Sequence, residues 1–253
     1  MSSSLPLAGK VAVITGSARN MGRAFAQRLA RNGTDVVVHY HAPSASNDAE
    51  ETARLVREQG VRAITICGNL ADLAVIRRLF DEAINTFGHV DIVINNAGLI
   101  IKKPFVEITE EDFDRSFGIN AKAAFFVMQE AARRIADYGR IINMGTTILG
   151  ATIPFYSVYA GSKAPLEDFT RALAREVGSR GVTVNTIAPG PIDDSFYHGQ
   201  ETPEAVAYAT RASVAGRLGR IDDILPLIEF LASPGSQWIT AQTLFINGGY
   251  LAR

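Results

Sequence analysis

Short apolar runs rich in β-branched residues alternate along this chain with longer stretches in which hydrophobic residues recur at helical spacing. The first runs are apolar at every position, a pattern typical of parallel strands that are covered on both faces. The predicted strands are Val11–Thr15, Val36–Tyr40, Ala63–Cys67, Asp91–Asn95, Arg140–Met144, Val182–Ile187 and Thr243–Ile246. Between residues 71 and 88, apolar side chains form one stripe and charged side chains lie largely outside it, which predicts an amphipathic helix. The alternation predicts an α/β fold with a doubly wound parallel sheet of about seven strands.

The alternation covers almost the whole chain, without a linker, a repeat or a low-complexity stretch. We therefore expect residues 1–253 to form a single domain. One segment departs from the pattern: residues 190–216 are rich in Pro, Gly, Asp and small residues, and a final helix is predicted from about Ile221. A long segment of this kind beside a sheet is typical of a binding loop, so we predict a substrate lid at about 190–216.

Composition excludes several classes of protein. The hydrophobic content of 47% can fill a large core, and a formal net charge of −1 provides no basis for binding nucleic acid or a membrane surface. Cys67 is the only cysteine, so an internal disulfide and a cysteine-based zinc site are both excluded. His39 and His41 lie on one side of a strand, but two histidines without a third ligand do not predict a metal site. The start of the chain lacks the features of a signal peptide, and no run of about 18 apolar residues occurs, so we expect a cytoplasmic protein without a membrane anchor.

A turn with two glycines, Gly16 and Gly22, lies between the first predicted strand and a helical pattern that reaches Ala30. A tight strand-to-helix turn points backbone N–H groups and the positive end of the helix dipole toward a pyrophosphate. Its position after the first strand makes this turn a candidate phosphate-binding site.

Tyr159 and Lys163 are the most informative pair of residues in the chain. In a helix, their separation of four residues places them on one face, one turn apart. A phenol has an ordinary pKa of about 10, and a fixed ammonium nearby favours the phenolate and draws that pKa down. Such a group can donate a proton to a carbonyl oxygen or accept one from an alcohol. The pair alone is common on helix surfaces, so its meaning depends on the surrounding motifs.

Those motifs occur in a fixed order. They are Asn95-Asn96-Ala97-Gly98 after the fourth strand, Asn120 in the next helix, Thr146 thirteen residues before Tyr159, Pro189-Gly190 after the sixth strand, and Asn247-Gly248-Gly249 after the seventh. Over about residues 8–250 the chain resembles the short-chain dehydrogenase/reductase family, with most similarity to its 3-oxoacyl-carrier-protein reductases. The resemblance implies a single-domain Rossmann-like fold. The family's turn usually reads Thr-Gly-x-x-x-Gly-x-Gly, so Asn20 stands in the place of the middle glycine; Asn tolerates left-handed backbone, which predicts a variant turn that still functions.

The resemblance implies a catalytic set of Asn120, Thr146, Tyr159 and Lys163. Tyr159 would be the proton donor in reduction and the base in oxidation, while Lys163 would lower its pKa and hydrogen-bond the nicotinamide ribose. Thr146 would donate to the carbonyl oxygen, with Thr147 as the competing candidate. Asn120 would anchor a water that links Lys163 to solvent.

The resemblance also implies a dinucleotide site at the ends of several strands. Its residues are Gly16, Ser17, Arg19, Asn20, Met21, Gly22, Tyr40, His41, Asn69, Leu70, Asn96, Ala97, Gly98, Tyr159, Lys163, Pro189, Gly190 and Ile192. NAD-dependent relatives carry Asp in the place of Tyr40, whereas Arg19 matches the basic residue that NADP-dependent relatives use against the 2′-phosphate. We therefore expect NADP(H) to be preferred over NAD(H); a loop arginine in water is the alternative interpretation of Arg19.

The substrate side is less well defined by the sequence. Asp194 lies near the place where relatives often have a Thr that contacts the nicotinamide carboxamide, and Ser195 is the substitute that the sequence offers for that Thr. The carboxylates of Asp193 and Asp194 would instead bind a polar substrate, or hold the loop in water. Phe155, Phe196 and Tyr208 would form an apolar wall, or belong to ordinary packing.

The leading hypothesis is an NADPH-dependent carbonyl reductase that acts on a small-molecule 3-oxoacyl or small ketone substrate and is reversible as an alcohol dehydrogenase. A pteridine reductase-like activity is the alternative, prompted by the variant turn and by His39-Tyr40-His41, although the arginine that those enzymes often carry next is Ala42 here. A non-enzymatic NADP(H) sensor is a third hypothesis, against which the complete catalytic set argues. By analogy with the family, we expect a homotetramer formed through the helices around residues 108–137 and 156–179.

Overall fold

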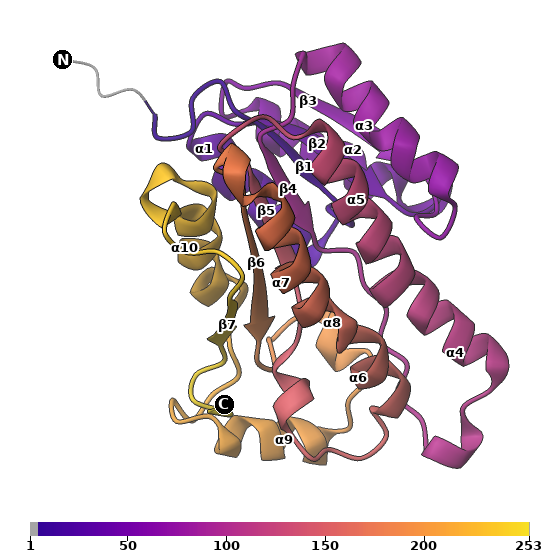
Figure 1. Cartoon of the computed structure of the whole chain (residues 1–253). Coiled ribbons are helices and arrows are strands. Elements are labelled where there is room, and N and C mark those ends of the chain that lie inside the picture. Colours follow the sequence, from indigo (N-terminus) through magenta and orange to yellow (C-terminus); the bar gives the residue numbers. More distant parts are fainter. Residues whose placement is uncertain (1–4, 253) are drawn as a thin grey trace.

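A single seven-stranded sheet forms the centre of the computed structural model, which describes residues 5–252 (Figure 1). The strands are β1 (Val11–Ile14), β2 (Asp35–Tyr40), β3 (Ala63–Cys67), β4 (Ile92–Asn95), β5 (Arg140–Met144), β6 (Thr183–Pro189) and β7 (Thr243–Ile246). All neighbouring pairs are parallel, in the order β3-β2-β1-β4-β5-β6-β7. The predicted strands and the doubly wound α/β fold are confirmed, with strand ends that differ by one or two residues. The outermost residues of the predicted domain, 1–4 and 253, lie outside the described residues.

Helices cover both faces of the sheet (Figure 1). They are α1 (Asn20–Arg31), α2 (Ser46–Arg57), α3 (Leu73–Phe87), α4 (Glu110–Phe117), α5 (Ala124–Arg134), α6 (Ser157–Lys163), α7 (Pro165–Val177), α8 (Ser195–His198), α9 (Pro203–Ala212) and α10 (Ile221–Ala232). Helices α1, α2 and α10 pack on one face, and α3, α5 and α7 pack on the other. Successive residues of β1 point to opposite faces: Ala12 and Ile14 join the first core, Val11 and Val13 the second. Burial on both faces explains why these strands are apolar at every position.

The helix predicted between residues 71 and 88 is confirmed as α3, and its ends have clear physical causes. The Asp72 carboxylate accepts a hydrogen bond from the backbone N–H of Ala74 at 2.9 Å, which caps the first turn. Gly88 ends the helix in a left-handed conformation, with φ of 90°. Ile76, Phe80 and Ala83 face the core from this helix.

The two long helices expected around residues 108–137 and 156–179 are each divided. A π-helical segment, Gly118–Ala123, separates α4 from α5. Pro165 separates α6 from α7, because proline lacks the N–H that would continue the helical hydrogen bonds. Ala164 keeps helical dihedral angles (φ −55°, ψ −41°), so the chain continues in the same direction through this break.

The segment expected to form a lid contains two short helices, α8 and α9, near the carboxyl ends of the central strands (Figure 1). The Asp194 and Thr202 side chains cap these helices by accepting hydrogen bonds from Tyr197 and Ala205 backbone N–H groups. Neither helix was predicted, because the segment lacks a long apolar stripe.

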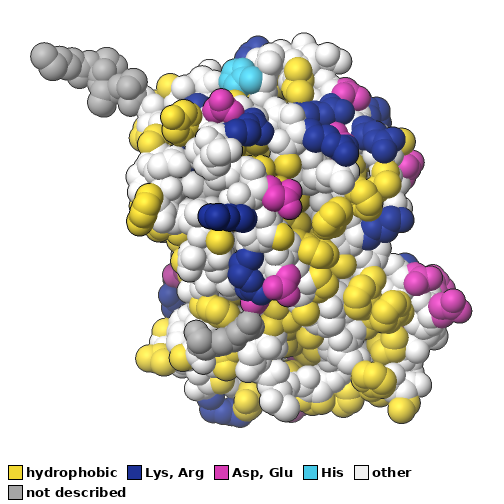
Figure 2. Space-filling model, in the orientation of Figure 1, with side chains coloured by type: hydrophobic (Ala, Val, Ile, Leu, Met, Phe, Trp, Pro, Cys, Tyr) yellow, Lys and Arg dark blue, Asp and Glu magenta, His cyan; other side chains and the backbone are white. Residues whose placement is uncertain are grey.

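The surface carries charges of both signs. Figure 2 shows Lys and Arg interspersed with Asp and Glu over the upper part of one face, whereas hydrophobic side chains gather at its lower right, near α4 and α5. Within residues 5–252, no helix is both long enough and apolar enough to cross a membrane.

Candidate active site

Two adjoining cavities open at the carboxyl ends of the central strands. The first, of about 720 Å³, is lined by the turn after β1, by residues that follow β2 and β3, and by the Asn96-Ala97-Gly98 turn. The second, of about 750 Å³, is lined by Thr146, Tyr159 and residues 189–192 together with the lid segment. Met21, Asp194 and Phe196 line both cavities, so the two spaces meet at these side chains. The carboxyl edge of an open α/β sheet, where β1 and β4 lie side by side, is where such folds bind ligands.

The turn after β1 has the geometry that the sequence predicts. Gly16 has φ of +63°, and Asn20 adopts a left-handed φ of 50°, as expected for Asn in place of glycine. A Cβ atom on Gly22 would lie 2.4 Å from the Gly16 carbonyl oxygen, so only glycine allows the turn and α1 to pack this closely. The Ser195 hydroxyl donates to Asn20 Oδ1 at 3.1 Å, which joins the turn to the lid segment.

His39 holds this turn from behind. The Gly16 backbone N–H donates to His39 Nδ1 at 3.1 Å, and His39 Nε2 is 2.9 Å from the Gly68 carbonyl oxygen. These two contacts require a neutral ring that carries its proton on Nε2. Burial lowers the pKa of His39 from 6.5 to about 4, which preserves that form at neutral pH. The first histidine of the His39-x-His41 pattern is therefore explained by its structural role in holding the turn.

Asn96 and Thr15 support the same turn from the side. Asn96 Nδ2 donates to the carbonyl oxygens of Thr15 and Gly16, at 3.0 Å each. The Thr15 hydroxyl accepts from the Asn96 and Ala97 backbone N–H groups. Ser17 is fully buried and donates to the Ile14 carbonyl oxygen, so its side chain does not line the cavity. Two of the predicted dinucleotide residues, Asn96 and Ser17, thus stabilise the conformation of the turn. Thr15 has the same role, which the sequence analysis did not predict.

Tyr159 and Thr146 meet in the second cavity. The Tyr159 side chain is 8% exposed, and the Thr146 side chain hydrogen-bonds it. Thr146 Oγ1 also accepts from the Ile148 backbone N–H at 3.3 Å. Thr147 is buried and donates to the Ala188 carbonyl oxygen at 2.9 Å. The geometry therefore favours Thr146 over Thr147 as the hydroxyl beside Tyr159.

Lys163 and Asn120 lie behind Gly98. A Cβ atom on Gly98 would be 3.3 Å from Asn120 Oδ1 and 3.4 Å from Lys163 Nζ. Lys163 Nζ donates to the Met144 carbonyl oxygen at 2.7 Å. The Asn120 side chain, in the π-helical segment, accepts from Leu99 N–H and donates to the Leu99 carbonyl oxygen. The structure thus brings the four predicted catalytic residues to one end of the sheet, and the Asn120 side chain is occupied in holding Leu99.

The protonation of Tyr159 differs from the sequence-based expectation that Lys163 lowers its pKa. Burial raises the pKa of Tyr159 to about 12, and the hydrogen bond from Thr146 opposes this only in part. Burial also lowers the pKa of Lys163 to about 8. In this structure the low dielectric around Tyr159 therefore dominates, and the phenol keeps its proton at neutral pH. That state suits a proton donor.

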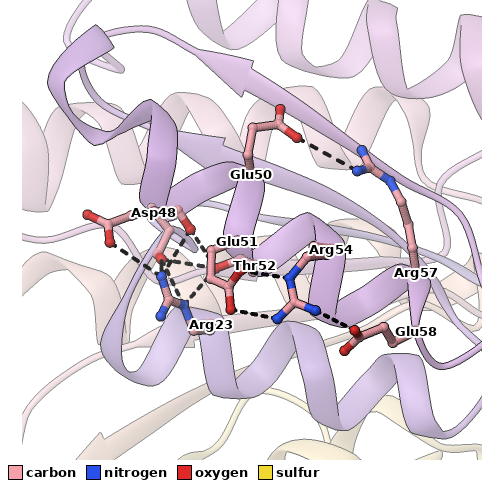
Figure 3. Close-up of polar contacts among 9 residues, drawn as sticks. Arg23, Asp48, Glu50, Glu51, Thr52, Arg54, Arg57 and Glu58 are labelled. Atoms are coloured by element: carbon pink, nitrogen blue, oxygen red, sulfur yellow. Dashed lines mark hydrogen bonds and ion pairs between the residues drawn. The ribbon is translucent and has the colours of Figure 1, made fainter.

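Arg19 lines the first cavity, as do Tyr40 and His41. Its side chain is 66% exposed, and its Nε is 3.5 Å from Asp48 Oδ2, a carboxylate on α2. Arg23 of α1 also reaches Asp48 and Thr52, as Figure 3 shows. Arg19 is therefore neither free nor firmly fixed, because an exposed ion pair is weak.

The remaining predicted residues line one cavity or the other. His41, Asn69, Leu70 and Met21 line the first; Pro189, Gly190 and Ile192 line the second. Phe155, Phe196 and Tyr208, three exposed aromatic side chains, also line the second cavity, which favours the apolar wall over ordinary packing.

The sequence analysis missed a polar cluster in the second cavity, formed by Lys102, Tyr156 and Glu201. Glu201 accepts a hydrogen bond from the Tyr156 hydroxyl and forms an ion pair with Lys102. Tyr156 lies 45 positions from Glu201 in the chain and Lys102 lies 99 positions from it, so no local sequence pattern could reveal these contacts.

Comparison with known proteins agrees with this geometry. A family model described as enoyl-(acyl carrier protein) reductase matches residues 16–251. A short-chain type dehydrogenase/reductase of Picea abies is 38% identical over 253 residues, which cover 96% of this chain and 93% of the relative. A hydroxynaphthalene reductase-like protein of Metarhizium brunneum is 38% identical over 256 residues, covering 96% and 95%. The crystal structure of a dehydrogenase from Burkholderia cenocepacia with bound NADP has a TM-score of 0.95 at 42% identity, covering 100% of this chain and 97% of that one.

The chain belongs to the short-chain dehydrogenase/reductase family and is an oxidoreductase.

Proposed function

We propose that this protein is an NADPH-dependent carbonyl reductase in which Tyr159 supplies the proton, and that the reaction is reversible as an alcohol dehydrogenation. The observation that carries the proposal is the position of Tyr159. Its phenol is buried, protonated and hydrogen-bonded to Thr146, and it lies in the second cavity, which adjoins the first cavity at the glycine turn. The Metarhizium relative is described as a reductase, which supports the reductive direction.

The first cavity fits a dinucleotide. Close packing of Gly16 against Gly22 leaves backbone N–H groups at the start of α1 available to a pyrophosphate. Asp194 Oδ2 is buried and has no hydrogen-bond partner within residues 5–252, at the junction of the two cavities. An orphaned acceptor there suits the amide N–H₂ of a nicotinamide carboxamide. Arg19 would bind the 2′-phosphate, and the bound NADP of the Burkholderia neighbour supports NADP(H) over NAD(H).

The chain's own residues would perform four tasks. The nicotinamide, when bound, supplies the hydride. Thr146 and Tyr159 would hydrogen-bond the carbonyl oxygen and hold it in the second cavity, and Tyr159 would then transfer its proton to that oxygen. Lys163 would hold positive charge near the phenolate that results, and would bind the ribose. A water at Asn120 would return a proton through Lys163; since the Asn120 side chain is occupied by Leu99, its backbone carbonyl is the group we propose to hold that water.

The test is a panel of carbonyl compounds assayed with both NADPH and NADH. We expect NADPH oxidation with at least one ketone or 3-oxoacyl thioester, and a lower kcat/KM with NADH on the same substrate. Turnover of a dihydropteridine alone would favour the pteridine reductase-like alternative. Tight NADPH binding without oxidation of any carbonyl would instead favour the sensor.

We also propose that the chain forms one domain closed by the lid segment and assembles as a homotetramer. Helices α4 and α5 expose Phe113 (48%) and Phe125 (40%), and a hollow beside them is lined by Phe117, Phe126 and Phe169. Exposed aromatic patches of this kind mark contact surfaces. Light scattering coupled to size-exclusion chromatography would measure the assembly, and a monomeric mass would contradict it.

A further inference from the structure

The Lys102–Tyr156–Glu201 cluster has the properties of a built site rather than of a surface ion pair. The Glu201 side chain is 2% exposed, that of Lys102 is 14% exposed, and Tyr156 is 8% exposed. All three line the same 750 Å³ cavity as Tyr159. The Tyr156 and Tyr159 ring centroids are 6.0 Å apart, so the cluster lies about one ring's width from the proposed proton donor. A cavity this close to the chemistry gains specificity from a few placed polar groups.

Two of the three residues are held in place independently of the lid. The Lys103 backbone N–H donates to the Phe155 carbonyl oxygen at 3.0 Å, which ties the loop after β4 to the loop before α6. Lys102 Nζ lies 5.2 Å from the centre of the Tyr156 ring. Phe155 keeps a left-handed φ of 72°, an unfavourable conformation for an aromatic residue. Glu201, by contrast, comes from the segment between α8 and α9, and its contacts with Lys102 and Tyr156 complete the cluster.

The cluster has hydrogen-bonding capacity to spare. An ammonium has three N–H donors, and within residues 5–252 Lys102 uses one of them, in a hydrogen bond to Glu201. A carboxylate has about four acceptor positions, and Glu201 receives one bond from Lys102 and one from Tyr156. Burial and the carboxylate raise the pKa of Tyr156 above its ordinary value, so this phenol remains a donor.

The charges define the group that would fit. Because Lys102 and Glu201 neutralise each other, an anionic ligand group would meet the carboxylate and a cationic one would meet the ammonium. A hydroxyl group both donates and accepts, so it can bond Glu201 and Lys102 at once. The rest of the wall includes the aromatic side chains of Phe155, Phe196 and Tyr208, which favour a ligand with a flat ring system.

We propose that Lys102, Tyr156 and Glu201 form a polar subsite that binds a hydroxyl group carried by a ring-containing ketone substrate, and that this subsite sets substrate preference. The proposal deepens the proposed reductase function and rests on it. The subsite holds the far end of the substrate, while Thr146 and Tyr159 hold the carbonyl oxygen.

Matched ketones test the subsite. Tetralone is a bicyclic aromatic ketone; its hydroxy derivatives can donate and accept, whereas the methyl ethers of those derivatives can only accept. With NADPH, we expect kcat/KM for at least one hydroxytetralone to exceed that of its methyl ether by about tenfold or more, the order of effect when a substrate hydroxyl meets a charged group. A ratio near one for every pair would overturn the proposal.

Two variants locate the effect. In Glu201→Gln and in Lys102→Met, we expect the hydroxyl-to-ether ratio to fall by about tenfold. Glu204→Gln makes the same change on the exposed start of α9 and should leave the ratio unaltered. Equal losses for the hydroxytetralone and its ether would show that the cluster only fastens the lid, and would refute the subsite. If one variant fails to fold, the other variant and the wild-type ratio still decide the matter.

A binding measurement separates failure of the subsite from failure of the reductase function. If the wild-type protein reduces no ketone, calorimetry with the protein, NADP⁺ and a hydroxytetralone still tests the contact. Tighter binding of the hydroxytetralone than of its ether, lost in Glu201→Gln, would support the subsite without the reaction. Equal or absent binding of both would overturn it.

Discussion

The two cavities meet at Met21, Asp194 and Phe196 but are built in different ways. The first is shaped mainly by backbone: the turn after β1 and the close approach of Gly16 to Gly22, braced by the buried side chain of His39 and the half-buried side chain of Asn96. The second is shaped by side chains from segments far apart in the chain, including a lid segment with its own short helices. The first cavity therefore follows from the sheet and its turns, whereas the second depends on contacts that single substitutions can alter.

This difference explains how one fold can retain a cofactor while the substrate changes. Backbone groups at strand ends are fixed by the hydrogen bonds of the sheet, so the first cavity tolerates change elsewhere. The second cavity contains a buried charge pair and three exposed aromatic side chains, which can vary without unfolding the sheet. Four experiments test this difference between the two cavities.

The largest effect is expected for Tyr159→Phe, which removes the proton donor from the second cavity and leaves the first intact. We expect kcat to fall by about a thousandfold or more, at the upper part of the range for general acid catalysis. NADPH binding, followed by fluorescence, should change less than about threefold. Unchanged turnover would remove Tyr159 from its proposed role.

Acid should lower the free energy of unfolding through protonation of His39, which holds the turn of the first cavity. Its pKa is about 4 in the folded protein, against an ordinary value of 6.5, so between these two values the unfolded chain binds the extra proton. The stability linked to this neutral ring is complete above about pH 6.5 and is lost as the pH falls toward 4, with a total of about 3 kcal/mol. Urea unfolding at several pH values would measure it.

Two histidine variants provide the comparison for that experiment. His39→Gln should be less stable at neutral pH and should lose less stability between pH 6.5 and 4 than the wild type. His41→Gln changes an exposed histidine two positions away, which is a smaller cause of the lowered pKa of His39 than burial is, and should keep most of the wild-type slope. Equal slopes in all three proteins would show that His39 does not titrate in this way.

Cofactor choice should depend on Arg19 at the rim of the first cavity. Arg19→Ala should lower the ratio of kcat/KM for NADPH to that for NADH by about tenfold, because a charge-assisted contact to the 2′-phosphate is lost. Asp48→Asn should raise the same ratio by a few fold, since it frees Arg19 from its exposed partner. Arg54→Ala, an exposed arginine of α2 paired with Glu51 and Glu58 (Figure 3), is the control. An unchanged ratio of kcat/KM for NADPH to that for NADH in Arg19→Ala would contradict the assignment of Arg19 to the 2′-phosphate.

The smallest effect is expected where the two cavities are joined. Ser195→Ala removes the hydrogen bond from the lid segment to Asn20. One such exposed bond between neutral groups contributes about 0.5–1 kcal/mol, so KM for NADPH should rise by about twofold to fivefold while kcat stays within about twofold. A large fall in kcat instead would mean that the lid and the turn move as one unit.

The features of this protein that could be predicted from its sequence are those set by neighbouring residues or by a regular hydrophobic pattern. Apolar runs with β-branched residues predicted the seven strands, because burial on both faces leaves no polar alternation. Gly16 and Gly22 predicted the turn, because close packing at these positions excludes a side chain. Helical spacing predicted that Tyr159 and Lys163 lie on one face of a helix, and the resemblance to the family added Thr146 to this pair.

The features that the sequence could not predict depend on contacts between segments that are far apart in the chain. The tertiary structure assigned His39 to the back of the turn and brought Asp48 to Arg19, both through contacts between separate elements. It showed that the pKa of Tyr159 is raised, because burial depends on every group packed around the phenol. It also brought Lys102, Tyr156 and Glu201 together, since pairing across tens of residues depends on how loops fold back over the sheet and leaves no periodic trace in the sequence.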